Sequence, residues 1–514
     1  MMESTTIPDQ SLLDGAETKQ KLSIKTSSLA VDGLGLIAAA VIPTAENVFS
    51  KQQMLNIADN PHWITTCDYC FMWLGDSVNL KTYTITVENS GTILKKCGGC
   101  QVVRYCSSSC QRKAWKSHHK AECKIYAEEC IEDVYLRATI RLLCMRKLGT
   151  ISDSQWYWVN RMQSHMEDYC RSEPLFRQAI SEAASMAKRW TGMADSEETI
   201  RELYCRIKLN HMTNIRMESE TTGITLDPLA AIINHSCDPN AFYSFEGAKI
   251  RVRSLRPIVA GEEITISYTD DTLARDTRRG YLTRWFFDCA CEKCAKNASD
   301  DVLKIPRGFN VEALNDAMQS FDFSQPDKSD FAIFGAGGPG VGWRADLQPI
   351  PNLHSHLATG YRAKTMFSDP TASHEVQLNL LNELRHRLPL CFVGEPAIRP
   401  ISTHPMRVIN LFMLTMLLRR IFLVKKDSST FPDFKFQRTE VGLVYRYHIM
   451  KVHEDVPISH GKDGPLAMSV DELMWRDFAV AGDLATMLAS MKEDQHQIMR
   501  GIHLRMLQWS GMRV

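Results

Sequence analysis

The sequence lacks a long, uninterrupted apolar run. The longest one in its second half, residues 411–424, contains Arg419 and Arg420 and is shorter than the ~20 apolar residues that a bilayer span requires. The first residues, MMESTTIPDQ, lack the basic and apolar segments of a secretory signal. These absences predict a protein without a membrane span that resides in the nucleus and cytoplasm.

A net charge and a clear internal repeat are also missing from this chain of 514 residues. The 60 basic residues balance the 60 acidic ones, which excludes a protein that binds nucleic acid through its overall charge. Residues 95–124 form a local basic stretch. Solvated lysines are the simpler explanation for it, and contact with nucleic acid is the weaker alternative.

Cysteine, by contrast, is abundant, with 16 residues. Without a secretory signal, these cysteines indicate metal or redox chemistry rather than disulfides. Residues 67–123 contain the spacings C-x2-C, C-x2-C, C-x3-C and H-x3-C, which together offer ligands for two tetrahedral zinc sites. The thiol ligands are Cys67, Cys70, Cys97, Cys100, Cys106, Cys110 and Cys123. His118 and His119 are both candidates for the remaining ligand, and the spacing to Cys123 favours His119.

The segment CGGCQVVRYCSSSCQRKAWKSHHKAEC resembles the MYND zinc finger. The resemblance implies interleaved sites, in which ligands one, two, five and six hold one zinc ion and the other four hold a second. It assigns Cys67, Cys70, Cys106 and Cys110 to the first site, and Cys97, Cys100, His119 and Cys123 to the second. The 26 residues between Cys70 and Cys97 exceed the usual gap of the family.

Three further motifs follow in order: NHSCDPN at 234–240, GEEITISY at 261–268, and a final cluster formed by Cys289, Cys291 and Cys294. The three thiols of the final cluster need a fourth ligand to complete a tetrahedral set. Cys237 is the unassigned cysteine inside another polar, turn-rich motif. We therefore expect a third zinc ion to join the two segments.

In this combination and order, the motifs resemble the SET domain. With the finger near the N-terminus, the chain is identified as a member of the SET and MYND domain family of protein-lysine methyltransferases. The resemblance implies an S-adenosylmethionine site formed by Gly33, Leu34, Gly35, Asn210, Ile233, Asn234, His235, Tyr268 and Phe287. Tyr268 takes the position of the catalytic tyrosine.

The expected reaction explains why these residue types occur. Methyl transfer from a sulfonium to an amine is an in-line displacement, so catalysis depends on positioning and electrostatics. A narrow apolar channel favours the neutral form of a substrate lysine, because desolvation penalises the ammonium form. Tyr268, Trp285 and Phe287 are candidates for that channel. Met212 and Trp285 depart from the phenylalanine and tyrosine common in the family, so we expect them to affect how many methyl groups the channel admits.

We expect an α+β fold, β-rich in the SET part, followed by a helical domain. Two strands joined by a glycine turn are expected within 22–49, several helices within 127–207, strands within 224–268, and one helix at 272–285. Long helical patterns occupy 375–387, 407–424 and 468–508, similar to the tetratricopeptide-like domain that family members carry. The predicted segments are a disordered arm (1–20), the two SET parts (21–66 and 208–270), the finger (67–123), a helical insert (124–207), the post-SET segment (271–297) and the helical domain (298–514).

A match to the dinucleotide fingerprint GxGxxG occurs at 335–340. Pro339 lies inside the match, and further prolines follow where the fingerprint requires a helix. The pattern therefore favours a Gly/Pro-rich loop over a nucleotide site.

We therefore expect a monomeric enzyme that uses S-adenosylmethionine and three zinc ions to methylate a lysine of a histone or another protein. One rival hypothesis is a catalytically silent scaffold whose finger binds proline-rich peptides. The intact Asn234, His235 and Tyr268 argue against that scaffold. A second rival is a chromatin regulator that binds nucleic acid.

Overall fold

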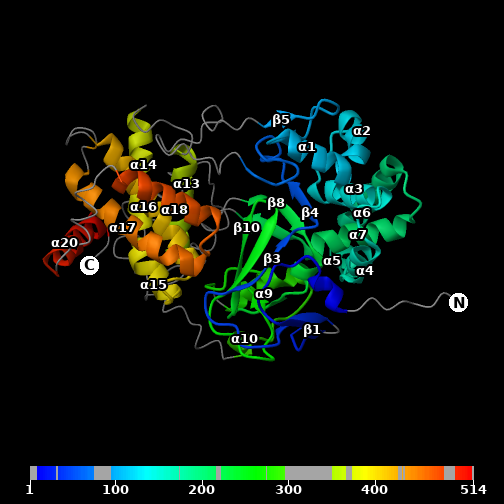
Figure 1. The fold of residues 1–514 in the computed structure, drawn as a ribbon, viewed down its shortest axis with the longest axis horizontal. Helices are drawn as coiled ribbons and strands as arrows, with labels where there is room; N and C mark the ends of the chain where they lie inside the picture. Colours follow the sequence, from blue (N-terminus) through cyan, green and yellow to red (C-terminus); the bar gives the residue numbers. More distant parts are fainter. Residues whose placement is uncertain are drawn as a thin grey trace. The chain divides into compact units, whose positions relative to one another are not determined.

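The computed structural model divides into two compact units (Figure 1). It describes residues 9–29, 33–73, 94–172, 174–215, 221–273, 275–295, 350–365, 373–425, 431, 434–479 and 493–511. The first unit holds the described residues up to 295, apart from a few at 272–275, and the second holds the helices from residue 350 onward. The match at 335–340 lies outside the described residues.

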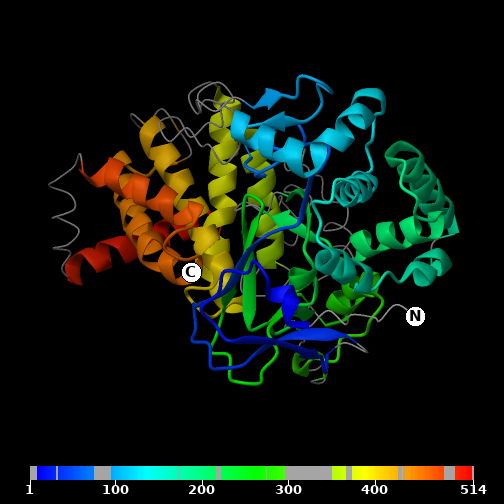
Figure 2. The ribbon, with the colours of Figure 1, turned by 45° about the vertical axis from the view of Figure 1, so that its right-hand side comes forward.

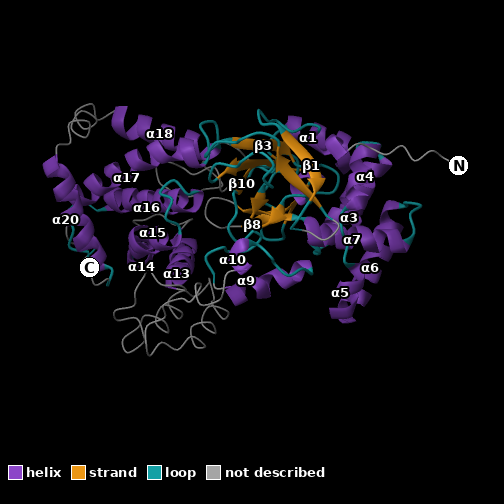
Figure 3. Ribbon diagram, turned by 90° about the horizontal axis from the view of Figure 1, so that it is seen from below, coloured by secondary structure: helices purple, strands orange, loops and turns teal. Residues whose placement is uncertain are grey.

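The first unit contains two three-stranded sheets and a hairpin, drawn in orange in Figure 3. The hairpin pairs β1 (Leu22–Thr26) with β2 (Leu34–Ala38). Of the two glycines that we expected in the turn between these strands, Gly33 precedes β2, but Gly35 lies within β2 opposite Lys25. One sheet has the strand order β10 (Ala241–Glu246), β11 (Lys249–Ser254), β3 (Asn47–Gln52). The other has the order β4 (Leu55–Ala58), β8 (Thr221–Leu226), β7 (Met212–Ile215).

Residues 9–52 differ from the expectation in two respects. β3 is a third strand in a stretch where we expected two, and Pro43, which has no N–H to donate, lies between it and β2. The second difference is a 3-10 turn, η1 (Asp9–Leu13), within the expected arm. Leu12 of this turn is buried in the core formed by Leu36, Phe49 and their neighbours. An apolar side chain thus anchors part of the arm.

We expected several helices within 127–207, and the structure has further helical elements at 108–128, mostly in the cysteine-rich finger, where none was expected. Hydrogen-bonding side chains cap many of these helices. Ser107, Asp133, Ser152 and Ser196 accept backbone N–H bonds from the first turns of their helices. The elements are α1 (Ser108–Ala114), a π-helical turn η3 (Trp115–His119), α2 (Lys120–Glu128), α3 (Val134–Lys147), α4 (Asp153–Arg161), α5 (Met166–Ser172), α6 (Pro174–Thr191) and α7 (Glu197–Asn210). Later in this unit come α8 (Pro228–Ala231), α9 (Arg275–Leu282), the 3-10 turn η4 (Thr283–Trp285) and α10 (Glu292–Ala295).

The described part of the second unit is helical, in yellow to red in Figure 2. Its elements are α13 (Ile350–Thr365), α14 (His374–Pro389), the π-helical turn η5 (Leu390–Gly394), α15 (Glu395–Ile398), α16 (Pro405–Val424), α17 (Arg438–Ser459), α18 (Pro465–Ala479) and α20 (Glu493–Trp509). α18 and α20 occupy the stretch expected to be one helical pattern, with 480–492 outside the described residues. α13 and α17 lie where we expected no particular element.

The apolar run that begins at residue 411 lies in α16, which packs against α14 and α17. The two arginines that interrupt the run are buried and paired. Arg419 Nε donates to Asp477 Oδ2 at 2.6 Å, and Arg420 Nη2 donates to the Thr365 carbonyl at 2.7 Å. α16 is therefore a core helix of this unit. None of the described helices combines the length and the apolar character that crossing a bilayer needs.

Candidate functional site

The first cysteine set of the finger brings together Cys67, Cys70, Cys106 and Cys110, whose sulfur atoms lie within 4.8 Å of one another. Cys106 Sγ is 3.6 Å from Cys70 Sγ and 3.4 Å from Cys110 Sγ. A zinc ion with Zn–S bonds of about 2.3 Å places tetrahedral sulfurs about 3.8 Å apart. The spacing therefore fits a structural zinc ion, and the long gap after Cys70 does not separate the ligands.

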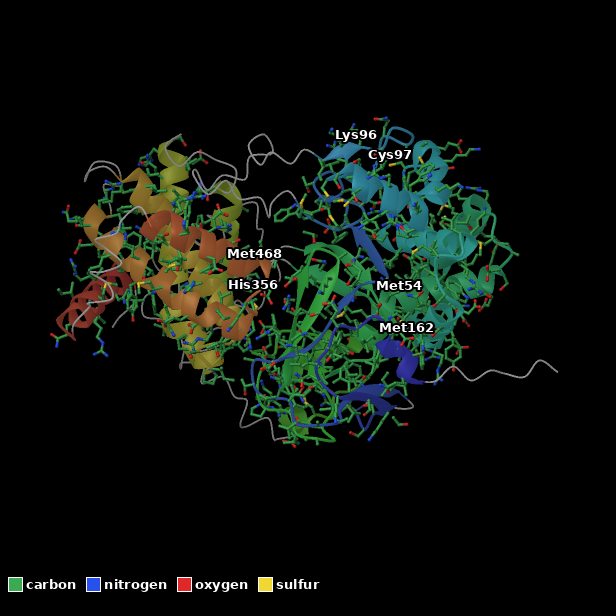
Figure 4. All side chains as sticks on the ribbon, viewed as in Figure 1. Met54, Lys96, Cys97, Met162, His356 and Met468 are labelled. Carbon is green, nitrogen blue, oxygen red and sulfur yellow. The ribbon has the colours of Figure 1, made fainter. Side chains whose placement is uncertain are left out.

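The second set contains Cys97, Cys100, His119 and Cys123 (Cys97 is labelled in Figure 4). His119 Nε2 lies 3.3 Å from Cys97 Sγ and 3.6 Å from Cys100 Sγ. A Cβ on Gly99 would lie 2.7 Å from Cys123 Sγ, so the turn between the first two ligands needs glycine. His118 faces elsewhere, with Nε2 3.3 Å from Asp68 Oδ2. The structure thus places His119, and not His118, in this set.

The third set joins Cys237 of the NHSC loop to Cys289, Cys291 and Cys294 of the final cluster. Cys237 Sγ lies 3.9 Å from Cys289 Sγ and 3.4 Å from Cys294 Sγ, and the four residues are buried. All of these cysteines are free thiols. Three four-ligand sets of thiolates, with one imidazole, are the donor sets of structural zinc, and each fits one ion.

The NHSC loop and the GEEITISY segment meet through a short parallel pairing. β9 (Asn234–His235) pairs with β12 (Thr265–Ile266), with Asn234 opposite Thr265. The buried Asn240 reinforces the pairing, because its amide donates to the Glu263 carbonyl at 2.8 Å and its side-chain oxygen accepts the Thr265 N–H at 2.8 Å. Two segments distant in sequence therefore form one rigid unit.

The first glycine turn reaches the same place through Asn234 and Glu263. Asn234 Nδ2 donates to the Leu34 carbonyl at 2.9 Å and to Glu263 Oε1 at 2.7 Å. A Cβ on Gly35 would lie 2.4 Å from Glu263 Oε1, so the close approach of this carboxylate requires glycine there. Gly33 accepts the Ser27 N–H through its carbonyl at 2.9 Å, which closes the turn. Asn234 thus contacts Leu34 directly and shares the neighbouring Glu263 carboxylate with Gly35.

Tyr268 lies at the centre of an aromatic cluster beside this loop. Its hydroxyl donates to the Ile233 carbonyl at 2.7 Å, and its backbone N–H donates to His235 Nδ1 at 2.9 Å. Its ring centroid is 5.0 Å from that of Trp285 and 6.4 Å from that of Phe287. Burial, and then the Glu263 carboxylate, raises the pKa of Tyr268 above its usual range. The hydroxyl is therefore protonated and acts as a hydrogen-bond donor at neutral pH.

Of the other two expected residues, Met212 packs in a cluster that this arrangement shares, whereas the hydrogen bonds of the Asn210 side chain go to residues outside it. Met212 begins β7 and is buried in the apolar cluster that contains Ile233 and against which Tyr268 packs. Asn210 ends α7, where its amide donates to the carbonyls of Arg206 at 2.8 Å and Gln163 at 2.9 Å. Both of its amide hydrogens are thus engaged, and its side-chain oxygen is the group that remains for a ligand.

The sequence patterns missed two positioning residues. Glu263 lies in the motif GEEITISY, from which we expected no role for it, but its carboxylate accepts hydrogen bonds from Asn234 and from Ser27 Oγ, the latter at 2.8 Å. Asp227 caps α8 just before the loop by accepting the Leu229 N–H at 2.9 Å, and it lies 3.2 Å from Lys51 Nζ. An Asp-Pro pair at a helix start was the available signal for Asp227.

Comparison with known proteins places this arrangement in a class: residues 33–269 match the model of the SET domain. A SET domain and MYND-type zinc finger protein 6 of Schizosaccharomyces pombe is 28% identical over 353 residues, covering 66% of this chain and 64% of that protein. The histone-lysine N-methyltransferase ASHR1 of Arabidopsis thaliana is 29% identical, covering 61% of this chain and 63% of that protein. The human histone-lysine N-methyltransferase SMYD3 is 29% identical, covering 40% and 50%.

This chain is therefore similar to SET-domain proteins, one of which is also named for a MYND-type zinc finger. The matches span between half and two thirds of the length of these relatives.

Proposed function

We propose that the protein is a protein-lysine N-methyltransferase that uses S-adenosylmethionine. The observation that carries this proposal is that hydrogen bonds join three separate segments of the chain. Asn234 of the NHSC loop bonds to Leu34, and Tyr268 of the GEEITISY segment bonds to Ile233 and His235 of the loop. The names of the relatives support it. The substrate is a lysine of a histone or of another protein.

The residues of the glycine turn and the NHSC loop would hold the cofactor. Both hydrogens of the Asn234 amide are used within the protein, so its side-chain oxygen is the group available to accept from a cationic donor. The Glu263 carboxylate, which accepts a hydrogen bond from the Asn234 amide nitrogen, adds a negative charge to this site. The charge distribution suits a cofactor that carries an ammonium and a sulfonium group.

The aromatic cluster would receive the substrate amine. S-adenosylmethionine supplies a methyl group to an amine when it is bound. Tyr268, Trp285 and Phe287 exclude water around the amine, which favours its neutral, nucleophilic form. The Tyr268 hydroxyl already donates to the Ile233 carbonyl, so its lone pairs remain to orient the N–H groups of the amine.

Methyl transfer is tested with radiolabelled S-adenosylmethionine and a fractionated proteome, followed by mass spectrometry of the labelled residue. We expect label on lysine side chains for the wild-type protein and a strong reduction for Tyr268→Phe. Absence of lysine label, combined with retained binding of S-adenosylhomocysteine and capture of proline-rich peptides by the full chain, would favour the scaffold instead.

The partners of the finger are a finer part of the proposal. Lys95, Lys96, Lys116 and Lys120 are exposed, and Trp115 is exposed by 43% among them. Exposed lysines are compatible with solvent alone, with an anionic partner such as nucleic acid, or with a finger that binds proline-rich peptides. A binding assay with oligonucleotides and proline-rich peptides at several salt concentrations tests the two alternatives, because only the former depends steeply on salt. The monomeric state and the nuclear and cytoplasmic location stay predictions.

A further inference from the structure

Arg141 of α3 is a buried cation that contacts two buried carboxylates. Its side chain is 3% exposed, and those of Glu122 and Asp68 are 0% and 9% exposed. Arg141 Nε donates to Glu122 Oε1 at 2.9 Å, and Nη2 donates to Asp68 Oδ1 at 2.8 Å. A third donor, Nη1, reaches the Asn56 carbonyl of β4 at 2.8 Å. One guanidinium therefore joins the two carboxylates to a strand of the SET core.

Each carboxylate is next in sequence to a ligand of a different zinc set of the finger. Asp68 lies between Cys67 and Cys70 of the first set, and its backbone N–H donates to the Arg104 carbonyl at 2.9 Å. Glu122 precedes Cys123 of the second set. Arg141 is thus the point at which the surroundings of the two sets meet.

Glu122 also faces the histidine ligand directly. His119 Nε2 points to the sulfur atoms, so a neutral, metal-binding imidazole carries its proton on Nδ1. That Nδ1 atom is buried without a hydrogen-bond partner in the structure, and Glu122 Oε2 lies 3.7 Å from it. Histidines that bind metal commonly donate their other N–H to a carboxylate, which fixes the orientation of the ring. Glu122 is in the position to do this, and Arg141 fixes Glu122.

The charges explain why the arrangement acts as a unit. Two carboxylates and the thiolates of both sets concentrate negative charge in a buried region, and Arg141 is the cation that pairs with both carboxylates. Removing one partner of a buried ionic network leaves the others uncompensated. A change at Asp68 therefore alters how Arg141 holds Glu122, although Asp68 is not a ligand of the second set.

We propose that Arg141 is a positioning residue that couples the two zinc sites of the finger, so that loosening one site loosens the other. The coupling runs from the loop around Asp68, through the guanidinium, to Glu122 and the ring of His119. The finger is thereby joined to the SET core through a shared ionic contact as well as through the chain. This inference does not depend on methyl transfer.

The test follows zinc release from the full-length, zinc-loaded protein after addition of an excess chelator with a colorimetric readout. Cys110→Ser, Cys123→Ser and Cys294→Ser assign the three release phases to the three sets. We expect Asp68→Asn, an isosteric change, to speed release from both finger sets by about 10-fold or more, as outer-shell changes at metal sites commonly do. Release from the third set, which Arg141 does not contact, should not change.

Arg141→Lys retains the charge but loses the forked geometry, so it should also speed release from both finger sets. Arg137→Lys is the matched control. Arg137 is buried on the same helix, but it donates to the Ala58 carbonyl at 2.9 Å and to Asn60 Oδ1 at 2.7 Å, and not to a carboxylate beside a zinc set. Its zinc release should stay within about twofold of wild type.

A double-mutant cycle isolates the coupling itself. In the presence of Arg141, Cys110→Ser should accelerate release from the second set, whereas in the Arg141→Lys background the same change should have little additional effect. The proposal is overturned if Asp68→Asn affects the first set alone, or if Arg137→Lys and Arg141→Lys give the same release profile. Circular dichroism of each variant before chelation confirms that the compared proteins are folded.

Discussion

The two units of this chain stabilise their folds by different means. The first unit combines short strands, some of only two residues, with three sets of zinc ligands and buried ion pairs. The described part of the second unit consists of long helices around Leu384, Leu414 and Leu417, and its one described cysteine, Cys391, belongs to none of the sets. Short strands and irregular segments bury little apolar surface of their own, whereas long helices bury a continuous face. The comparison teaches that zinc ligands supplement the apolar cores of the first unit where its cysteine-rich segments meet.

Zinc removal is the change whose effects on the stability of the two units should differ most. Structural zinc contributes about 10–16 kcal/mol in small zinc-binding folds, so chelation should unfold the finger and the final cysteine cluster. The helices of the second unit should keep their amide protection. Elemental analysis should find three zinc ions per chain before chelation, and hydrogen exchange by mass spectrometry should locate the loss of protection afterwards.

A zinc count near two would show that one of the three sets does not bind zinc. If Cys237→Ser lowers the count by one, the third set binds an ion. Equal loss of protection in α14 and α16 would contradict the division into metal-dependent and metal-independent units.

A cavity in the core of the second unit should destabilise that unit and leave the zinc sites of the first unit intact. Leu414 is 0% exposed in the middle of α16, so Leu414→Ala removes buried methyl groups and leaves a cavity. Such changes cost about 2–5 kcal/mol of unfolding free energy. Thermal or denaturant unfolding measures the loss, while the zinc content of the folded variant should remain three. The exposed Leu423, at 42%, supplies the control, because Leu423→Ala should cost far less.

Tyr268→Phe changes the first unit without disturbing its metal sites. The ring and its packing against Trp285 remain, but the hydroxyl that donates to the Ile233 carbonyl is lost. If the proposed function is right, kcat/KM should fall by the equivalent of about 2–4 kcal/mol, while binding of S-adenosylhomocysteine stays nearly constant. Zinc content should equal that of wild type, and the loss of the hydrogen bond to the carbonyl of the buried Ile233 should lower the free energy of unfolding by about 1–3 kcal/mol. Wild-type activity in this variant would refute the assignment of the tyrosine.

The sequence predicted the metal sites more completely than the cofactor site, and the reason lies in the chemistry of the ligands. A tetrahedral ion fixes how many ligands each set needs, so the three thiols of Cys289, Cys291 and Cys294 require a fourth ligand, and the polar motif around Cys237 supplies the candidate. The contact between Gly35 and Glu263 could not be predicted in this way. It depends on how the glycine turn and the GEE motif approach one another, which local patterns do not encode.

The same limit applies to the buried charges. Arg141 sits on a helix whose pattern is typical of any helical insert, and its two carboxylate partners come from other segments of the chain. Arg419 and Arg420 likewise looked like interruptions of an apolar run, although they are paired inside a core. Tertiary contacts between distant segments decide whether such a charge is exposed or buried. The third strand β3 was missed for a similar reason, since its partner β11 lies about 200 residues away in the chain.

Buried histidines should give the second unit a measurable but smaller sensitivity to pH. Burial, with Arg399, Arg407 and His460 nearby, lowers the pKa of His404 to about 3. Burial lowers that of His503 to about 4, and that of His448, 2.8 Å away, well below its usual value. The unfolded chain binds protons near pH 6.5 and the folded unit does not, so the stabilising effect is complete above that pH and is lost as the pH falls. Each histidine should cost about 0.7 kcal/mol between pH 7 and pH 6. Hydrogen exchange of α16 and α17 at the two pH values, corrected for the intrinsic exchange rate, measures the loss.

His404→Asn is the sharpest variant, because His404 caps α16 by accepting the Met406 N–H at 3.2 Å and asparagine can accept the same bond without titrating. The pH dependence of α16 opening should therefore decrease in this variant by about the share of one histidine. If the pH dependence of α16 opening is the same in His404→Asn as in wild type, the fold does not lower the pKa of His404.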